Sequence, residues 1–187
     1  FLNFNNNFSE LFLSLTSSVS NIGFSLNNNS TNLSFIFLLL VIIGGSFFST
    51  SSGIRFLKIY SLFKYSINEI LSYSRPKNIY INKHLFSKEF FKLDEIYKYF
   101  LSVIIFILSL LFLTFLLTLS NIEFENSFKL SILTLMNTVN SSMYGLGDFS
   151  FYDLHFLTKY YIISFMIIGR LELLTLLIIC KKFLFKN

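Results

Sequence analysis

The stretch GGSFFSTSSGIR, residues 44–55, interrupts an apolar run that begins at Phe35 and ends at Ile43. It brings together a glycine pair, five hydroxyl side chains and a closing arginine. Inside a bilayer, small and hydroxyl residues can satisfy an unwound backbone only against protein or water. The sequence therefore predicts a broken membrane helix in which residues 44–53 face a pore. A kinked helix whose small residues permit tight packing is the alternative interpretation.

The composition is that of a membrane protein. Of 187 residues, 53% are hydrophobic and 13% are charged, and 26 Phe stand against one Pro, which does not match a soluble domain with a charged shell. The only cysteine, Cys180, excludes a disulfide within the chain, and its distance from His84 and His155 gives no ligand-like spacing. We therefore expect neither a transition-metal site nor a Cys/His catalytic pair. Because the first residue is Phe1 rather than Met, we also expect a fragment of a longer protein.

Three segments are long and apolar enough to cross a membrane. Residues 101–119 carry no charge, and a bilayer core needs about 20 helical residues. A second span covers residues 154–180, with Arg170 and Glu172 in its middle, and a third begins near Leu33 and contains the opening stretch. The sequence predicts a multi-pass protein in contact with membrane lipid.

Charge sets the orientation of these spans. Between Arg55 and Lys98 there are nine Lys or Arg and four Asp or Glu, and three lysines close the chain. By the positive-inside rule both regions face the cytoplasm, so the polar links at 27–32 and 123–126 lie outside. The span from Leu33 then runs inward, the next runs outward, and the last runs inward again.

Two shorter segments, residues 10–19 and 128–139, precede the two inward spans. Each is too short to cross the bilayer but long enough to enter it and return, which is the topology of a pore helix. We therefore predict an all-α integral membrane fold of repeated helix–pore-helix–helix modules, incomplete in this chain. The expected divisions are a first module over 1–70, a cytoplasmic basic linker over 71–95, and a second module over 96–187.

An internal repeat supports the two modules. LTSSVSNIGF, residues 15–24, aligns with LMNTVNSSMY, residues 135–144, at an offset of 135 − 15 = 120. Self-similarity of this kind indicates related structural modules. The alignment places Met143 opposite Gly23; an alternative register, with a two-residue insertion, places Gly145 there.

The residues after each pore helix are candidates for an ion selectivity filter. The C-terminal end of a helix offers about half a negative charge to a cation, and extended backbone beyond it can offer carbonyls in place of water. Glycine suits such a loop because it reaches conformations that a side chain opposes. The predicted filter residues are Ser20, Asn21, Ile22, Gly23 and Phe24 in the first module and Asn140, Ser141, Ser142, Met143 and Tyr144 in the second.

These motifs resemble a known family. SNIGF (20–24) with GGSFFSTSSGIR looks like the third repeat of the Trk/Ktr/HKT potassium-transporter superfamily, and NSSMYGLG (140–147) with GRLELLTLL (169–177) is similar to the fourth repeat of its Trk branch. The resemblance covers nearly the whole chain. It implies a non-enzymatic pore subunit for K+ uptake across the bacterial inner (plasma) membrane, with K+ held by filter carbonyls and no other cofactor. It also implies four repeats around one ion path, a homodimer, and a cytoplasmic nucleotide-binding regulatory subunit, with no nucleic-acid partner.

The resemblance further implies a gate below the filter. Its residues would be Gly44, Gly45, Ser49, Thr50 and Gly53, with Arg170. A cation in the middle of a span costs at least about 2.5–3.5 kcal/mol unless it faces a pore or a partner, and a structural ion pair between helices is the alternative role for Arg170. The chain departs from the family where Phe48, Ser51 and Ser52 replace common glycines and where Met143 replaces the filter glycine.

Two alternative functions belong to other classes of membrane protein. A non-transporting membrane subunit of an energy-converting complex would also have Phe-rich helices and one buried Arg. A membrane-embedded enzyme would need paired carboxylates, a nucleophile with its base, or metal ligands within the spans, and the sequence offers none of these.

Overall fold

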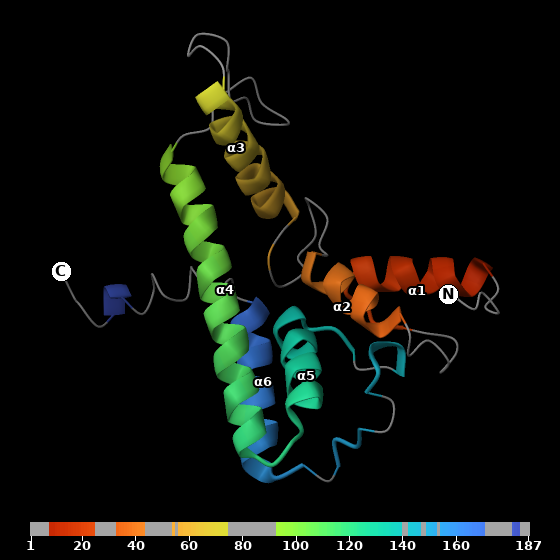
Figure 1. The fold of residues 1–187 in the computed structure, drawn as a ribbon. Coiled ribbons are helices and arrows are strands. Elements are labelled where there is room, and N and C mark those ends of the chain that lie inside the picture. Colours follow the sequence, from red (N-terminus) through yellow and green to blue (C-terminus); the bar gives the residue numbers. More distant parts are fainter. Residues whose placement is uncertain are drawn as a thin grey trace.

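The computed structural model describes residues 8–24, 33–43, 54, 56–74, 93–139, 142–146, 149–152, 154–170 and 181–183. Within these ranges all regular structure is helical and no strand occurs. In chain order the elements are α1 (Phe8–Val19), α2 (Ser34–Ile43), α3 (Phe56–Ser74), α4 (Leu93–Leu119), α5 (Phe124–Met136), the 3₁₀ turn η2 (Ser142–Tyr144) and α6 (Phe156–Arg170) (Figure 1). The expected all-α fold is confirmed.

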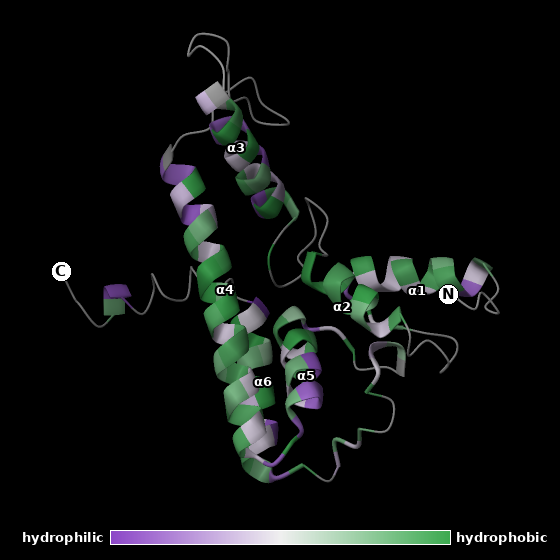
Figure 2. Cartoon of the chain, viewed as in Figure 1, coloured by the Kyte–Doolittle hydropathy of each residue, from purple (hydrophilic) through white to green (hydrophobic). Residues whose placement is uncertain are grey.

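The helix α4 contains a segment, Asp94–Leu119, that is long and apolar enough to cross a membrane, with 26 residues and a mean hydropathy of 3.0 in its most apolar window. It is apolar on every side along most of its length, with polar residues gathered at its N-terminal end (Figure 2). Only one stripe, which includes Leu110, Leu113 and Leu117, is buried, while Leu108 and Phe112 are exposed. A helix that is apolar all round but buried on one stripe belongs in lipid or against further protein. The predicted span at 101–119 is confirmed.

Three helices, α2, α4 and α6, pack around α5, while α3 packs against α4. Helices α4 and α6 lie side by side, and α5 packs against both of them (Figure 1). The helix α5 also contacts α2, and α2 packs against α1. The two short helices α1 and α5 therefore lie in the same region of the molecule. The fully buried side chains of Val41, Leu113 and Leu135 come from α2, α4 and α5 and form the centre of the core.

The two predicted short helices are present, with shifted ends for α5. It begins at Phe124 rather than 128, with Glu125 in its first turn, where a carboxylate interacts favourably with the helix dipole. It ends at Met136 rather than 139, because Asn137 takes the left-handed conformation with φ 54°. Asparagine tolerates that conformation better than most residues. Three residues expected to be helical or at the helix end therefore belong to the loop.

Candidate functional site

The helix α1 ends in a turn that redirects the chain. Asn21 has φ 58°, its N–H donates to the Ser18 carbonyl at 3.2 Å, and the N–H of Ile22 donates to the Ser17 carbonyl at 3.0 Å. A left-handed residue with these two backward bonds is a standard helix C-terminal cap. The predicted filter segment 20–24 therefore starts directly at the C-terminal end of α1.

Ser17 holds three successive amides of this segment. Its carbonyl accepts the N–H of Ile22 and, at 3.5 Å, that of Gly23. Its hydroxyl oxygen accepts the N–H of Phe24 at 2.6 Å. In a planar trans peptide the carbonyl points opposite to the next N–H, so the carbonyls of Asn21, Ile22 and Gly23 are turned away from α1. The Ile22 carbonyl accepts the N–H of Val139 at 3.3 Å, so the carbonyls of Asn21 and Gly23 are the ones suited to binding a cation.

The helix α5 ends with the same cap. Asn137 has φ 54°, its N–H donates to Thr134 at 3.2 Å, and the N–H of Thr138 donates to Leu133 at 3.0 Å. The position of Ser17 is taken by Leu133, which has no hydroxyl. The second loop therefore lacks the side-chain acceptor that holds the third amide of the first loop.

Each cap is also tied to the helix that follows its loop. With its amide oriented to satisfy its neighbours, Asn21 donates to the Val41 carbonyl of α2 at 3.2 Å. Asn137 Nδ2 donates to the Met166 carbonyl of α6 at 3.0 Å. Beside this second contact, a Cβ built on Gly169 would lie 2.4 Å from the Leu135 carbonyl oxygen. The helices α2 and α6 thus fix where α1 and α5 end.

The two loops touch each other. The N–H of Val139 donates to the Ile22 carbonyl at 3.3 Å. Gly23, with φ +81°, lies so close that a Cβ there would be 2.4 Å from the Val139 carbonyl oxygen. The C-terminal ends of α1 and α5 therefore meet, and both direct partial negative charge toward the junction. Among the described residues no cluster of His, Cys, Asp or Glu can hold a metal ion, so the donors available here are backbone carbonyls and hydroxyls.

The later part of the second loop lies in the core. Ser142 begins the turn η2, and the side chains of Met143 and Tyr144 are fully buried. The turn packs against α2, and the Ser18 hydroxyl lies 3.9 Å from the sulfur of Met143. These residues fill space between α1 and α2.

Several predicted site residues lie outside the described part of the chain. They are Asn140 and Ser141 of the filter, and Gly44, Gly45, Ser49, Thr50 and Gly53 of the gate. Ile54, which follows the gate stretch, is buried. Arg170 is described as the last residue of α6, and its side chain is exposed.

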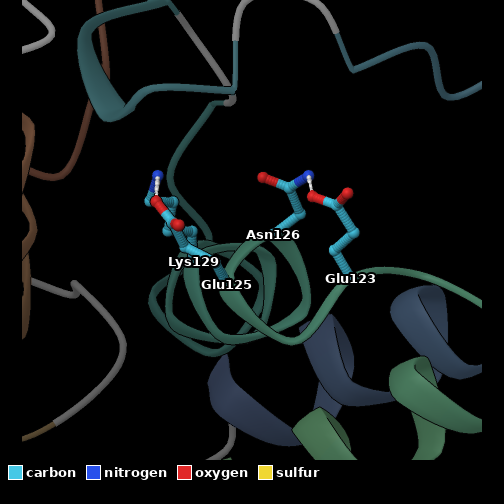
Figure 3. Close-up of polar contacts among 4 residues, drawn as sticks. All are labelled: Glu123, Glu125, Asn126 and Lys129. Atoms are coloured by element: carbon cyan, nitrogen blue, oxygen red, sulfur yellow. Dashed lines mark hydrogen bonds and ion pairs between the residues drawn. The ribbon is translucent and has the colours of Figure 1, made fainter.

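At the other end of α5 the charges are paired within the helix (Figure 3). Lys129 Nζ lies 2.6 Å from Glu125 Oε1, and Asn126 donates to Glu123 at 3.3 Å. The hydrogen bond from Lys129, and then its positive charge, lower the pKa of Glu125. A lowered carboxyl pKa means that the pair persists at neutral pH and is lost only as the pH falls below the ordinary range for glutamate.

The fold of this chain is similar to that of a solved transporter. The chain matches the potassium transporter TrkH from Vibrio parahaemolyticus with a TM-score of 0.73 and 22% sequence identity over 92% of its length. The chain has a TrkH-like fold. It spans 36% of the length of TrkH. No family sequence profile matches the chain, and no curated protein matches it in sequence.

Within the TrkH-like fold, sequence reasoning missed the roles of Ser17, Asn137 and Gly169. A second internal repeat carries the signal that would have found them: VIIGG at 41–45 and MIIGR at 166–170 share Ile-Ile-Gly. The residues that accept the cap amides, Val41 and Met166, open these two matching stretches.

Proposed function

We propose that this chain forms part of the K+ path of a Trk-type pore subunit in a bacterial inner membrane. The observation that carries the proposal is the meeting of two capped pore helices whose loops touch, with three carbonyls of the first loop turned away from α1. Helix C-termini and backbone carbonyls attract and desolvate a monovalent cation without any acidic side chain. The likeness to a potassium transporter supports this choice of ion.

The proposed roles follow the two loops and the inward helices. Residues 20–24 and the loop after α5 provide filter carbonyls, and K+ is the transported ion rather than a resident cofactor. Residues 44–53 form the gate below them, where Arg170 opposes the passage of cations. The protein moves ions and carries out no covalent chemistry.

The proposal includes protein partners. The exposed apolar side chains on α4, such as Leu108 and Phe112, would face lipid, further repeats or a second copy in a homodimer. The basic region from Arg55 to Lys98 would face the cytoplasm, where a nucleotide-binding regulatory subunit would dock.

Growth at low potassium tests this function. The full native gene product, expressed in bacteria that lack their own K+ uptake systems, should restore growth on low K+ and drive uptake of ⁸⁶Rb+. Excess K+ should compete with the tracer. Normal membrane expression without growth or uptake would contradict transport, and would instead favour a non-transporting subunit that copurifies with a larger complex.

A further inference from the structure

The two loops correspond to each other in a register that the sequence does not suggest. Asn21 and Asn137 share the left-handed conformation, and the backbone N–H of each donates a hydrogen bond to the carbonyl three residues before it. In both loops the N–H of the next residue donates to the carbonyl five residues before that residue. The side-chain amide of each asparagine donates a hydrogen bond to a carbonyl of the helix that follows the loop. Four matching features fix the offset at 137 − 21 = 116. By that offset Thr138 corresponds to Ile22, and Val139 corresponds to Gly23.

We infer that Thr138 and Val139, rather than Met143 and Tyr144, form the ion-facing wall of the second loop. Val139 is exposed and in backbone contact with the first loop, through its N–H to Ile22 and the close approach of its carbonyl to Gly23. Met143 and Tyr144 are fully enclosed beside α2. We therefore place them in the core behind Thr138 and Val139, where they support these two residues.

The hydroxyl of Thr138 is a second, independent observation. Its residue is 4% exposed, and its Oγ1 has no hydrogen-bond partner in the described part of the chain. An unpartnered buried hydroxyl is unfavourable unless water or a ligand completes it. At the junction of two helix C-termini, a partly dehydrated monovalent cation is a ligand of the right charge.

The two walls are therefore unequal. Gly23 reaches φ +81°, whereas Val139 is absent from the residues with positive φ, as expected for a β-branched side chain. The third amide of the first loop is held by the Ser17 hydroxyl, and the second loop has Leu133 at that position. Because selection of K+ depends on the number and orientation of carbonyls, we expect Val139 to reduce the selectivity of this path for K+ over Na+.

Cysteine crosslinking tests the register without any need for transport. In a Cys180→Ser background of the full native gene product, Ile22→Cys with Val139→Cys should form a disulfide on mild oxidation, since a backbone hydrogen bond brings the two residues into range. Ile22→Cys with Met143→Cys should keep both thiols open to labelling after denaturation. Crosslinking of the second pair and not the first would overturn the register. Protection of the single Met143→Cys thiol from labelling before denaturation, at this fully buried position, confirms that the protein remains folded.

Ion selectivity tests the consequence, which rests on the proposed function. Val139→Gly should raise the ratio of K+ to Na+ uptake by about threefold or more. The reason is that a glycine in the second loop can adopt a carbonyl orientation like that of Gly23. Thr138→Val should lower uptake, and the volume-conserving Met143→Leu should leave the ratio unchanged. A shift with Met143→Gly and none with Val139→Gly would overturn the inference. If Ile22→Cys and Val139→Cys crosslink in a protein that transports no K+, the proposed function is rejected, but the inferred register of the second loop still holds.

Discussion

At the scale of single residues, Gly23 is the most constrained position in the site. Its φ of +81° is unfavourable for any residue with a side chain, and the space where a Cβ would lie is occupied by the Val139 carbonyl oxygen at 2.4 Å. The nearby Gly145 has a similar φ of +73°, but there the nearest atom is the flexible Lys129 Nζ at 3.2 Å. The two glycines therefore separate the effect of backbone strain from that of contact between the loops.

We predict that Gly23→Ala reduces ⁸⁶Rb+ uptake per folded molecule by about tenfold or more, since strain of roughly 1–2 kcal/mol is joined by a backbone clash. Gly145→Ala carries the strain without the clash and should lower stability while leaving most of the flux. Uptake normalised to the monodisperse protein fraction measures both. Equal losses of flux in the two variants would show that contact between the loops has no special role.

At the scale of elements, the crossing of α5 and α6 depends on Gly169. The Leu135 carbonyl at the end of α5 lies where the Gly169 side chain would be, and the Asn137 amide bonds to α6 one turn away. The helix α5 can thus end at this level of α6 only because Gly169 presents no side chain there.

Gly169→Ala should therefore destabilise the folded protein by about 1–3 kcal/mol, the usual range for overpacking. The measurement is the midpoint of thermal unfolding in detergent. Ile167→Ala, at an exposed position on the same helix, is the control and should shift the midpoint less. A larger loss at Ile167 than at Gly169 would mean that α6 does not pack on α5 through its glycine.

Arg170 follows that glycine and is exposed at the end of the described α6. If it faces the ion path, Arg170→Ala should raise the flux per folded molecule, because a cation repels K+ strongly where water is scarce. Arg170→Lys, which keeps the charge, should stay closer to the native flux. A fall in the yield of folded protein with unchanged flux would instead assign Arg170 to a structural ion pair.

The helices were predictable because length and apolar content distinguish a spanning segment such as 101–119 from short segments such as 10–19. The register of the second loop was not. In the register of the two caps the second loop has Val139 at the position of Gly23, and the chain from Asn137 to α6 is longer than the chain from Asn21 to α2. An alignment by residue similarity follows Leu and Val and places Met143 opposite Gly23, whereas the register that we infer from the caps places Val139 there. The gate residues, apart from Arg170, lie outside the described part of the chain and remain predictions.

At the scale of the whole molecule, the proposed function assigns this chain two of the walls of an ion path. It has a TrkH-like fold over 36% of the length of TrkH, and α4 keeps apolar faces that nothing in the described part of the chain covers. The central claim is that K+ occupies the junction where the loops after α1 and α5 meet. That claim concerns occupancy, which can be measured apart from flux.

Protection of a cysteine by K+ is the most direct test. In the full native gene product with Cys180→Ser, Ile22→Cys places an exposed thiol at the junction, and Phe8→Cys places one at the far end of α1. A small cationic thiol reagent should modify Ile22→Cys more slowly in K+ than in a large organic cation at equal ionic strength, while the rate at Phe8→Cys stays the same. Equal rates at Ile22→Cys in the two solutions would contradict the occupation of this junction by K+.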